Sequence, residues 1–395
     1  MRTEGAERHV TVVEELELAR RAYEGQAWTE TSARLAALDQ QAPLAVDDLI
    51  RWGTACHLRG DREQSRRLLQ RGHDQAAGEQ DPCAAARCAF WLGMSHVETG
   101  QHAVAAGWFS RAGEHLERGP EDCPERGYLL LPQALMRLEG GDLAGAQEAV
   151  EQVRAVGERH QVPDLQVVGT HVLGRLRLYR DDIAGGLTLL DHAMTGLLSS
   201  RLTPILAGQV YCSTVEACQE LGDLDRVRQW TAALVQWCQE QPDLVPYTGQ
   251  CAVHRGQLMA LDGALDDACQ EFRLACERYQ QIGAPFAAGL ARYEEGEVHR
   301  LRGEYDAARG CYDEAAEHGH DGHPGRALLA LATGDEDAAL PGLERALAES
   351  TGPVRRLRVL PAVARVATET GELDHVLDYA EPLPGPGYVF MDSPG

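Results

Sequence analysis

Apolar and small residues recur at fixed distances from a glycine turn along this chain. In the unit around Gly303, one glycine lies seven residues before the turn, and large and small residues follow at offsets of 2, 5, 9 and 12. Comparable residues occupy these offsets after Gly100, Gly263 and Asp181. The pattern predicts a hairpin of two helices, with small residues where the helices cross and a large residue between them. The residues concerned are Gly296, Tyr305, Ala308, Tyr312 and Ala315 around Gly303, and Gly93, His102, Ala105, Phe109 and Ala112 around Gly100.

The turn repeats ten times, at intervals of 40 or 41 residues between Gly60 and Gly303. Glycine accepts the left-handed conformation that ends a helix, and a following acidic residue suits the exposed N–H groups of the next helix. One hairpin cannot bury its apolar face, so neighbouring hairpins must stack into a superhelix with a concave surface. The pattern resembles the tetratricopeptide repeat and predicts an all-α superhelix of about ten hairpins over residues 1–381, with a disordered Pro/Gly tail over residues 382–395. The predicted turns lie at Gly25, Gly60, Gly100, Gly141, Asp181, Gly222, Gly263, Gly303, Gly334 and Gly371.

Composition excludes several classes of function. The 395 residues carry a formal charge of −24, which opposes binding to nucleic acid because that affinity depends on neutralised phosphates. The chain contains neither lysine nor asparagine. A Walker A lysine, a Schiff-base lysine and a Cys-His-Asn triad are therefore ruled out, because the residue types they require are absent.

The cellular compartment is inferred from targeting and membrane signals that the sequence lacks. The N-terminal residues include no apolar signal region, and no stretch reaches the roughly 18 apolar residues typical of a membrane span. Eleven cysteines are scattered without a CxxC pair, as expected of reduced thiols in a helical core. We therefore expect a cytoplasmic protein that binds neither membrane nor nucleic acid directly.

Two segments point to a more specific resemblance. The runs Gln241–Arg255 (QPDLVPYTGQCAVHR) and Gly296–Glu304 (GEVHRLRGE) are similar to the repeat region of actinobacterial LuxR-type transcriptional regulators. The resemblance covers roughly Leu129 to Leu347 and implies a sensing or assembly module. The nucleotide-binding and helix-turn-helix domains of that family have no counterpart here, since no GxxxxGK[ST] motif occurs and the segment after Leu377 is short and Pro-rich.

The tetratricopeptide resemblance also implies a concave groove, lined by positions 13, 10, 6 and 3 residues before each turn. In the early repeats these positions are apolar, as at Phe90, Met94 and Leu131, and from the fifth repeat onward they become polar. Such a concentration of polar groups predicts a ligand site, although a solvated wall explains it as well. Arg175 and Arg300 are the favoured partners for a carboxylate or phosphate. With His254 added, the predicted groove residues are His171, Arg175, Gln209, Glu216, Gln219, Gln250, His254, Gln257, Tyr293, Glu297 and Arg300.

One histidine cluster, His318, His320 and His323, has a spacing that could hold a divalent metal. It lies in a Gly-rich segment between repeats, where a solvated turn is the alternative. The pattern contains no motif of a nucleophile and its base. We therefore predict no catalytic residue, no metal and no cofactor.

These observations favour a non-enzymatic scaffold that senses a ligand or binds a protein or peptide partner in the concave groove. Its role would be regulatory, as in the sensor module of a LuxR-type regulator. The alternative is an enzyme, or enzyme accessory, of bacterial specialised metabolism that uses the groove as a substrate pocket. A small-molecule ligand and a homo-oligomer are left open. A closed pocket with convergent titratable groups would favour the enzyme, and an open trough the scaffold.

Overall fold

The structure, a computed structural model, describes residues 2–241, 243–349, 356 and 359–371. Over these residues the chain forms nineteen helices and no strand, which confirms the all-α prediction. The tail predicted over residues 382–395 lies outside the described residues. The helices are α1 (Arg2–Glu24), α2 (Trp28–Asp39), α3 (Val46–Leu58), α4 (Arg62–Gly78), α5 (Pro82–Val97), α6 (His102–Glu117), α7 (Pro124–Glu139), α8 (Leu143–His160), α9 (Pro163–Tyr179), α10 (Ile183–Ser199), α11 (Pro204–Glu220), α12 (Leu224–Gln239), α13 (Thr248–Leu261), α14 (Leu265–Gln281), α15 (Pro285–Leu301), α16 (Tyr305–Glu317), α17 (Gly325–Ala332), α18 (Glu336–Glu349) and α20 (Leu360–Thr370).

The predicted turns have the predicted geometry at every position but the first. Gly60, Gly100 and Gly263 have φ angles of 85°, 70° and 81°, and Asp181 adopts the same left-handed conformation at 60°. The prediction at Gly25 is wrong by one residue, because Gln26 is the left-handed residue there, with φ of 59°. The amide of Gly25 still bonds to the carbonyl of Arg21, so α1 keeps a helical bond at that point and the chain turns one residue later.

The glycine seven residues before the turn has a steric reason. A Cβ built on Gly256 of α13 would lie 2.6 Å from the ring of Phe272 on α14. The Gly296 and Tyr312 pair of the next repeat gives the same distance. In these hairpins the first helix therefore needs a glycine to accept the large ring of the second, as the sequence offsets predict.

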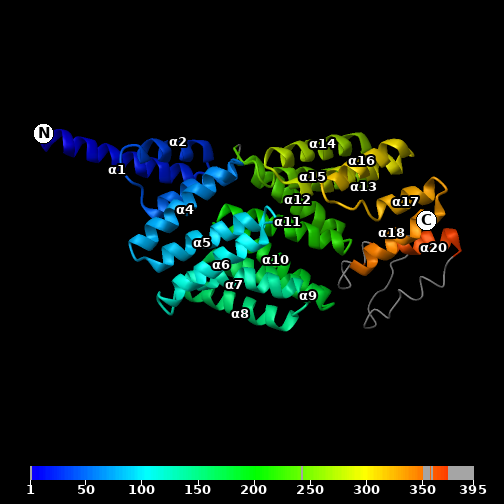
Figure 1. The fold of residues 1–395 in the computed structure, drawn as a ribbon, viewed down its shortest axis with the longest axis horizontal. Helices are drawn as coiled ribbons and strands as arrows, with labels where there is room; N and C mark the ends of the chain where they lie inside the picture. The colour runs from blue at the N-terminus through cyan, green and yellow to red at the C-terminus, as the bar shows by residue number, and fades with distance from the viewer. Residues whose placement is uncertain (1, 242, 350–355, 357–358, 372–395) are drawn as a thin grey trace. The chain divides into compact units, whose positions relative to one another are not determined.

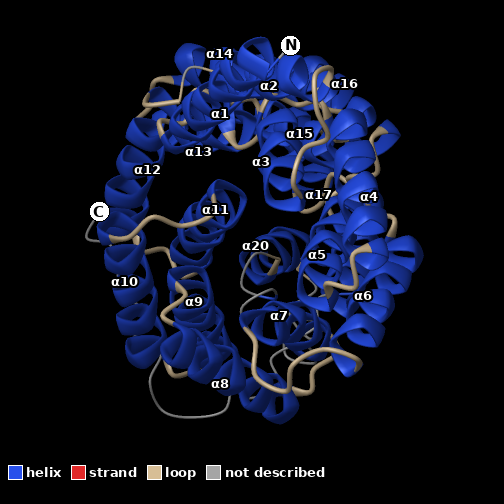
Figure 2. Ribbon diagram, turned by 90° about the vertical axis from the view of Figure 1, so that its left-hand side faces the viewer, coloured by secondary structure: helices blue, strands red, loops and turns tan. Residues whose placement is uncertain are grey.

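The chain divides into two compact units, residues 1–291 and 292–395. In the first unit, consecutive helices pack as antiparallel pairs such as α7 with α8 and α9 with α10 (Figure 1). The odd-numbered helices α5, α7, α9 and α11 lie on the inner side, and α6, α8, α10 and α12 on the outer side (Figure 2). In the second unit, a buried cluster joins α17, α18 and α20, with Leu343 and Val366 fully buried.

The superhelix of the first unit closes on itself. The loop between α12 and α13 reaches the first repeats, where the amide of Val245 donates to the carbonyl of Leu58 at 2.8 Å and Asp243 accepts from the amide of Thr29 at 3.1 Å. Trp28, with no exposed surface, shares a buried cluster with residues far along the chain. That cluster comprises Trp28, Ala55, Leu58, Leu69, Phe90, Trp91, Leu92, Ile205, Leu206 and Leu244.

All eleven cysteines are free thiols, and eight of them are buried. None of the helices in the described part of the chain is both long enough and apolar enough to cross a bilayer.

Candidate functional site

The two groove residues predicted on α9 bond to polar side chains of α11 that were not among the predicted positions. His171 lies between two hydroxyl groups of α11, with Nε2 at 3.0 Å from Ser213 Oγ and Nδ1 at 3.3 Å from Thr214 Oγ1. One turn further along α9, Arg175 donates to Glu220 at 3.1 Å. The guanidinium of Arg175 is therefore already paired, and an anionic ligand would compete with Glu220.

The same arrangement continues between α11 and α13. Gln219 donates to Gln257 at 2.6 Å, and Gln250 donates to Glu216 at 3.2 Å. His254 lies among these amides, with Nε2 at 3.3 Å from Gln250 Nε2. We call these residues of α9, α11 and α13 the polar ladder: His171, Arg175, Ser213, Thr214, Glu216, Gln219, Glu220, Gln250, His254 and Gln257.

Burial sets the charge of the two histidines in the ladder. His171 is 5% exposed and His254 is 1% exposed. Burial, helped by the nearby charge of Arg175, lowers the pKa of His171 to about 3. Burial lowers the pKa of His254 to about 4. Both imidazoles are therefore neutral at physiological pH and act as hydrogen-bonding groups rather than as cations.

The remaining predicted groove residues are placed separately. Gln209 is half-buried near the start of α11. In the second unit, Arg300 donates to Glu297 at 2.7 Å, and Glu297 also accepts from the hydroxyl of Tyr312. The ring of Tyr293 lies 5.8 Å from that of Tyr312. Ligand binding by the predicted groove residues stays a prediction.

The histidine cluster does not form a compact ligand set. His320 stacks against Tyr293 at 4.7 Å and its Nδ1 accepts from the amide of Gly322 at 3.2 Å. His318, His320 and His323 are not among the groups of three ligand atoms that the described structure brings within 4.8 Å of one another. Their ring nitrogens would have to rearrange before they could share a metal.

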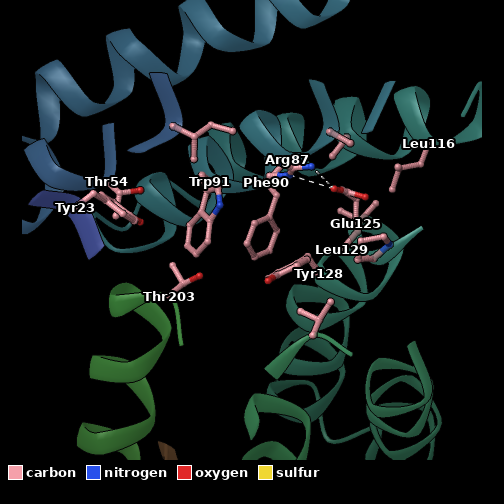
Figure 3. Close-up of a pocket in the computed structure, with 15 residues that line it drawn as sticks. Tyr23, Thr54, Arg87, Phe90, Trp91, Leu116, Glu125, Tyr128, Leu129 and Thr203 are labelled. Carbon is pink, nitrogen blue, oxygen red and sulfur yellow. Dashed lines mark hydrogen bonds and ion pairs between the residues drawn. The ribbon is translucent and has the colours of Figure 1, made fainter. Parts of the chain in front are cut away.

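A pocket of about 300 Å³ lies in the first unit, apart from the polar ladder. Four aromatic side chains line it: Tyr23 of α1, Phe90 and Trp91 of α5, and Tyr128 of α7 (Figure 3). Thr54 of α3 and Thr203, which precedes α11, add hydroxyl groups. The full lining is Tyr23, Ile50, Thr54, Ala86, Arg87, Phe90, Trp91, Ala112, Leu116, Pro124, Glu125, Tyr128, Leu129, Val162 and Thr203.

The charged groups at the pocket are paired within the protein. Arg87 donates to Glu125 Oε1 through Nη2 at 2.7 Å and through Nε at 3.1 Å, as Figure 3 shows. Just beyond the wall, Asp164 accepts from the hydroxyl of Tyr128 at 2.7 Å and from the amide of Thr203 at 2.7 Å. Burial and the charge of Asp164 raise the pKa of Tyr128 above its usual range.

A simple rule of sequence underlies these pairs. Glu125 and Asp164 each follow the proline that begins an inner helix, where an acidic side chain suits the helix N-terminus. Their partners, Arg87 and Tyr128, each lie 13 residues before a turn. The acid at the start of one inner helix thus bonds to the preceding inner helix.

This pocket was not predicted from the sequence, although part of the signal was present. The offset of 13 residues that selects Gln209 and Gln250 also selects Arg87 and Tyr128. The contributions of Tyr23 and Thr203 follow no repeat offset, because those residues come together only when the superhelix closes. Long-range closure was not predictable from the repeat.

Replacing Tyr128 by phenylalanine is expected to lower the free energy of unfolding by about 1.5–3 kcal/mol, because it removes a hydrogen bond to a charged, buried acceptor. Urea denaturation followed by circular dichroism measures the loss. Tyr179→Phe is the matched control, because the Tyr179 hydroxyl only accepts a 3.3 Å bond from Arg175. Equal stability of Tyr128→Phe and the unchanged protein would contradict the role given to Asp164.

Comparisons with known proteins found distant structural similarity and no match in sequence. No family model matches the chain, and no curated protein matches it in sequence. Among solved structures, the apo form of RapI is similar with a TM-score of 0.48 and 9% identity, covering 94% of each chain. Yeast Tom70 is similar with a TM-score of 0.48 and 12% identity, covering 92% of this chain and 89% of Tom70. Aspartyl phosphate phosphatase F from Bacillus subtilis gives 0.46 and 11%, covering 96% of each. The fold class therefore rests on the helices and turns of this chain.

Proposed function

We propose that this chain is a non-enzymatic scaffold that binds a peptide segment of a protein partner, with one apolar or aromatic side chain of the peptide seated in the aromatic pocket. The pocket itself is the observation that supports this proposal. Four aromatic rings and several aliphatic groups surround a volume at the lower end of the range for ligand sites. A volume of this size suits an anchor side chain better than a large cofactor.

The chemistry of the lining favours binding over catalysis. The described lining holds no serine, cysteine or histidine, and its one carboxylate, Glu125, is held by Arg87. Its two ionic side chains, Arg87 and Glu125, already neutralise each other. The histidines of the polar ladder contact hydroxyl and amide groups, and they are weak bases because burial lowers their pKa values to about 3 and about 4.

The regulatory part of the proposal rests on the resemblance to LuxR-type sensor modules. A peptide in the pocket would touch α1, α5 and α7 together with the segment before α11, which are far apart in sequence. Binding would then favour the closed superhelix over any opened form and could change how a partner docks. The polar ladder is the second part of the proposed site, where Arg175 would exchange Glu220 for a carboxylate of the ligand.

Selection of random displayed peptides on the purified full chain tests the proposal. We expect selected peptides to be enriched in aromatic residues. Leu129→Trp places an indole ring in the pocket where an aliphatic side chain stood. It should weaken their binding at least about tenfold, by analogy with the loss of one anchor residue. The matched control is Met136→Trp on the same helix, because Met136 is 65% exposed.

Two outcomes would overturn the proposal. Peptides that bind Leu129→Trp as well as they bind the unchanged protein would place the partner elsewhere. Failure to select peptides, together with retention of a small molecule in native mass spectrometry, would replace the peptide by a small ligand.

A further inference from the structure

Two cysteines and a glutamate converge beside the aromatic pocket. Cys83 lies in the first turn of α5, and Cys123 directly precedes α7, whose first turn contains Glu125. One ligand atom from each of the three side chains lies within 4.8 Å of the other two.

We propose that Cys83, Cys123 and Glu125 form a binding site for a borderline-soft divalent metal ion of the Zn²⁺ class. Thiolate and carboxylate groups are established ligands of such ions, whereas thiolates disfavour Mg²⁺ and Ca²⁺. In a tetrahedral site with Zn–S bonds of about 2.3 Å, two sulfur atoms lie about 3.8 Å apart. The three atoms therefore need to move by no more than about 1 Å to reach ligand positions.

The surroundings of Glu125 fit this role. Both hydrogen bonds from Arg87 end on Oε1, so Oε2 receives neither of them. Arg87 thus fixes the orientation of the carboxylate in the way that outer hydrogen bonds orient metal ligands. Arg87 also bonds to Asp47 at 2.8 Å, which offsets part of its positive charge near the site.

The burial of the three residues suits a bound ion with an entry path. Cys123 and Glu125 are each 6% exposed, whereas Cys83 is half-buried. Two thiolates and one carboxylate carry a charge of three, which exceeds that of the ion by one. The beginnings of α5 and α7 lie at these residues, and the positive ends of helix dipoles stabilise such excess negative charge. A water molecule would complete four ligands.

Titration of the reduced, metal-free full chain with Co²⁺ tests the site, because cobalt bound by thiolates gives charge-transfer bands in the ultraviolet. We expect one equivalent of Co²⁺ to develop these bands, Zn²⁺ to displace it, and Mg²⁺ to have no effect. Cys83→Ser should lower the affinity at least about a hundredfold, since even outer-shell changes cost ten- to a hundredfold.

Cys238→Ser is the matched control, because Cys238 is another half-buried free thiol and is not one of the three proposed ligands. It should leave the bands unchanged. Circular dichroism of each variant verifies the fold, and Cys123→Ser provides a second test if Cys83→Ser fails to fold. Absence of thiolate bands, bands that survive in both Cys83→Ser and Cys123→Ser, or their loss in Cys238→Ser would overturn the proposal. This readout is independent of peptide binding, so either proposal can fail alone.

Discussion

Replacing Trp28 by alanine is expected to lower the free energy of unfolding by about 3–5 kcal/mol, the usual cost of removing a fully buried large ring. The indole has no exposed surface and packs edge-on against Tyr23 at 5.5 Å. Its cluster includes Ile205 and Leu244, so the loss should also loosen closure of the superhelix. Urea denaturation measures the total loss, and amide hydrogen exchange at Val245 measures the closure.

Two further variants separate closure from ordinary packing. Phe272→Ala removes a ring that is 1% exposed and packs between the neighbouring helices α13 and α14. It should cost a similar free energy, while exchange at Val245 changes little. Trp28→Phe should retain most of the stability, because the buried indole N–H has no hydrogen-bond acceptor among the described residues. Unchanged protection of Val245 in Trp28→Ala would show that Trp28 does not support the closure.

Lowering the pH from 7 to 5 is expected to destabilise the first unit by about 4 kcal/mol through His171 and His254 together. Their pKa values are about 3 and about 4 in the folded protein and about 6.5 in the unfolded chain. Between these values the unfolded chain binds more protons, so stability is fully present above about pH 6.5 and declines as the pH falls. Each imidazole accounts for about 2 kcal/mol of the stability lost at pH 5.

Denaturation midpoints measured at several pH values test this expectation. His254→Gln should reduce the loss of stability between pH 7 and pH 5 by about 2 kcal/mol, because glutamine does not titrate. The control is His102→Gln, which makes the same substitution at an exposed imidazole at the start of α6. Equal slopes for His254→Gln and the unchanged protein would show that His254 is not held neutral by burial.

The helices and their turns could be predicted because each depends on local chemistry. Gly256 must be small to accept Phe272, and the residue at Gly263 must adopt a left-handed conformation. Both positions therefore recur as glycine at a fixed distance from the turn of a repeat. The error at Gly25 arises where the repeat is least regular, since the left-handed turn falls on the next residue, Gln26. The repeat pattern predicts the exact turn residue only where the surrounding sequence follows the regular spacing.

The candidate sites were predictable only in part. The offsets assigned Glu216, Gln219, Gln250 and Gln257 to two successive inner helices, but they could not show that these side chains bond to one another. The aromatic pocket depends on Tyr23 and Thr203, which are brought together by closure. The pairing of Cys83 with Cys123 joins the starts of two inner helices and also needs the three-dimensional arrangement.

The bond between Leu58 and Val245 restricts how this protein can evolve. An open solenoid can gain or lose a whole repeat, because each unit contacts only its neighbours. Here an extra repeat of about 40 residues between α3 and α13 would rotate the α12–α13 loop away from the first repeats. Duplication and deletion of repeats in this interval should therefore be selected against. Insertions should collect instead in the loops on the outer side.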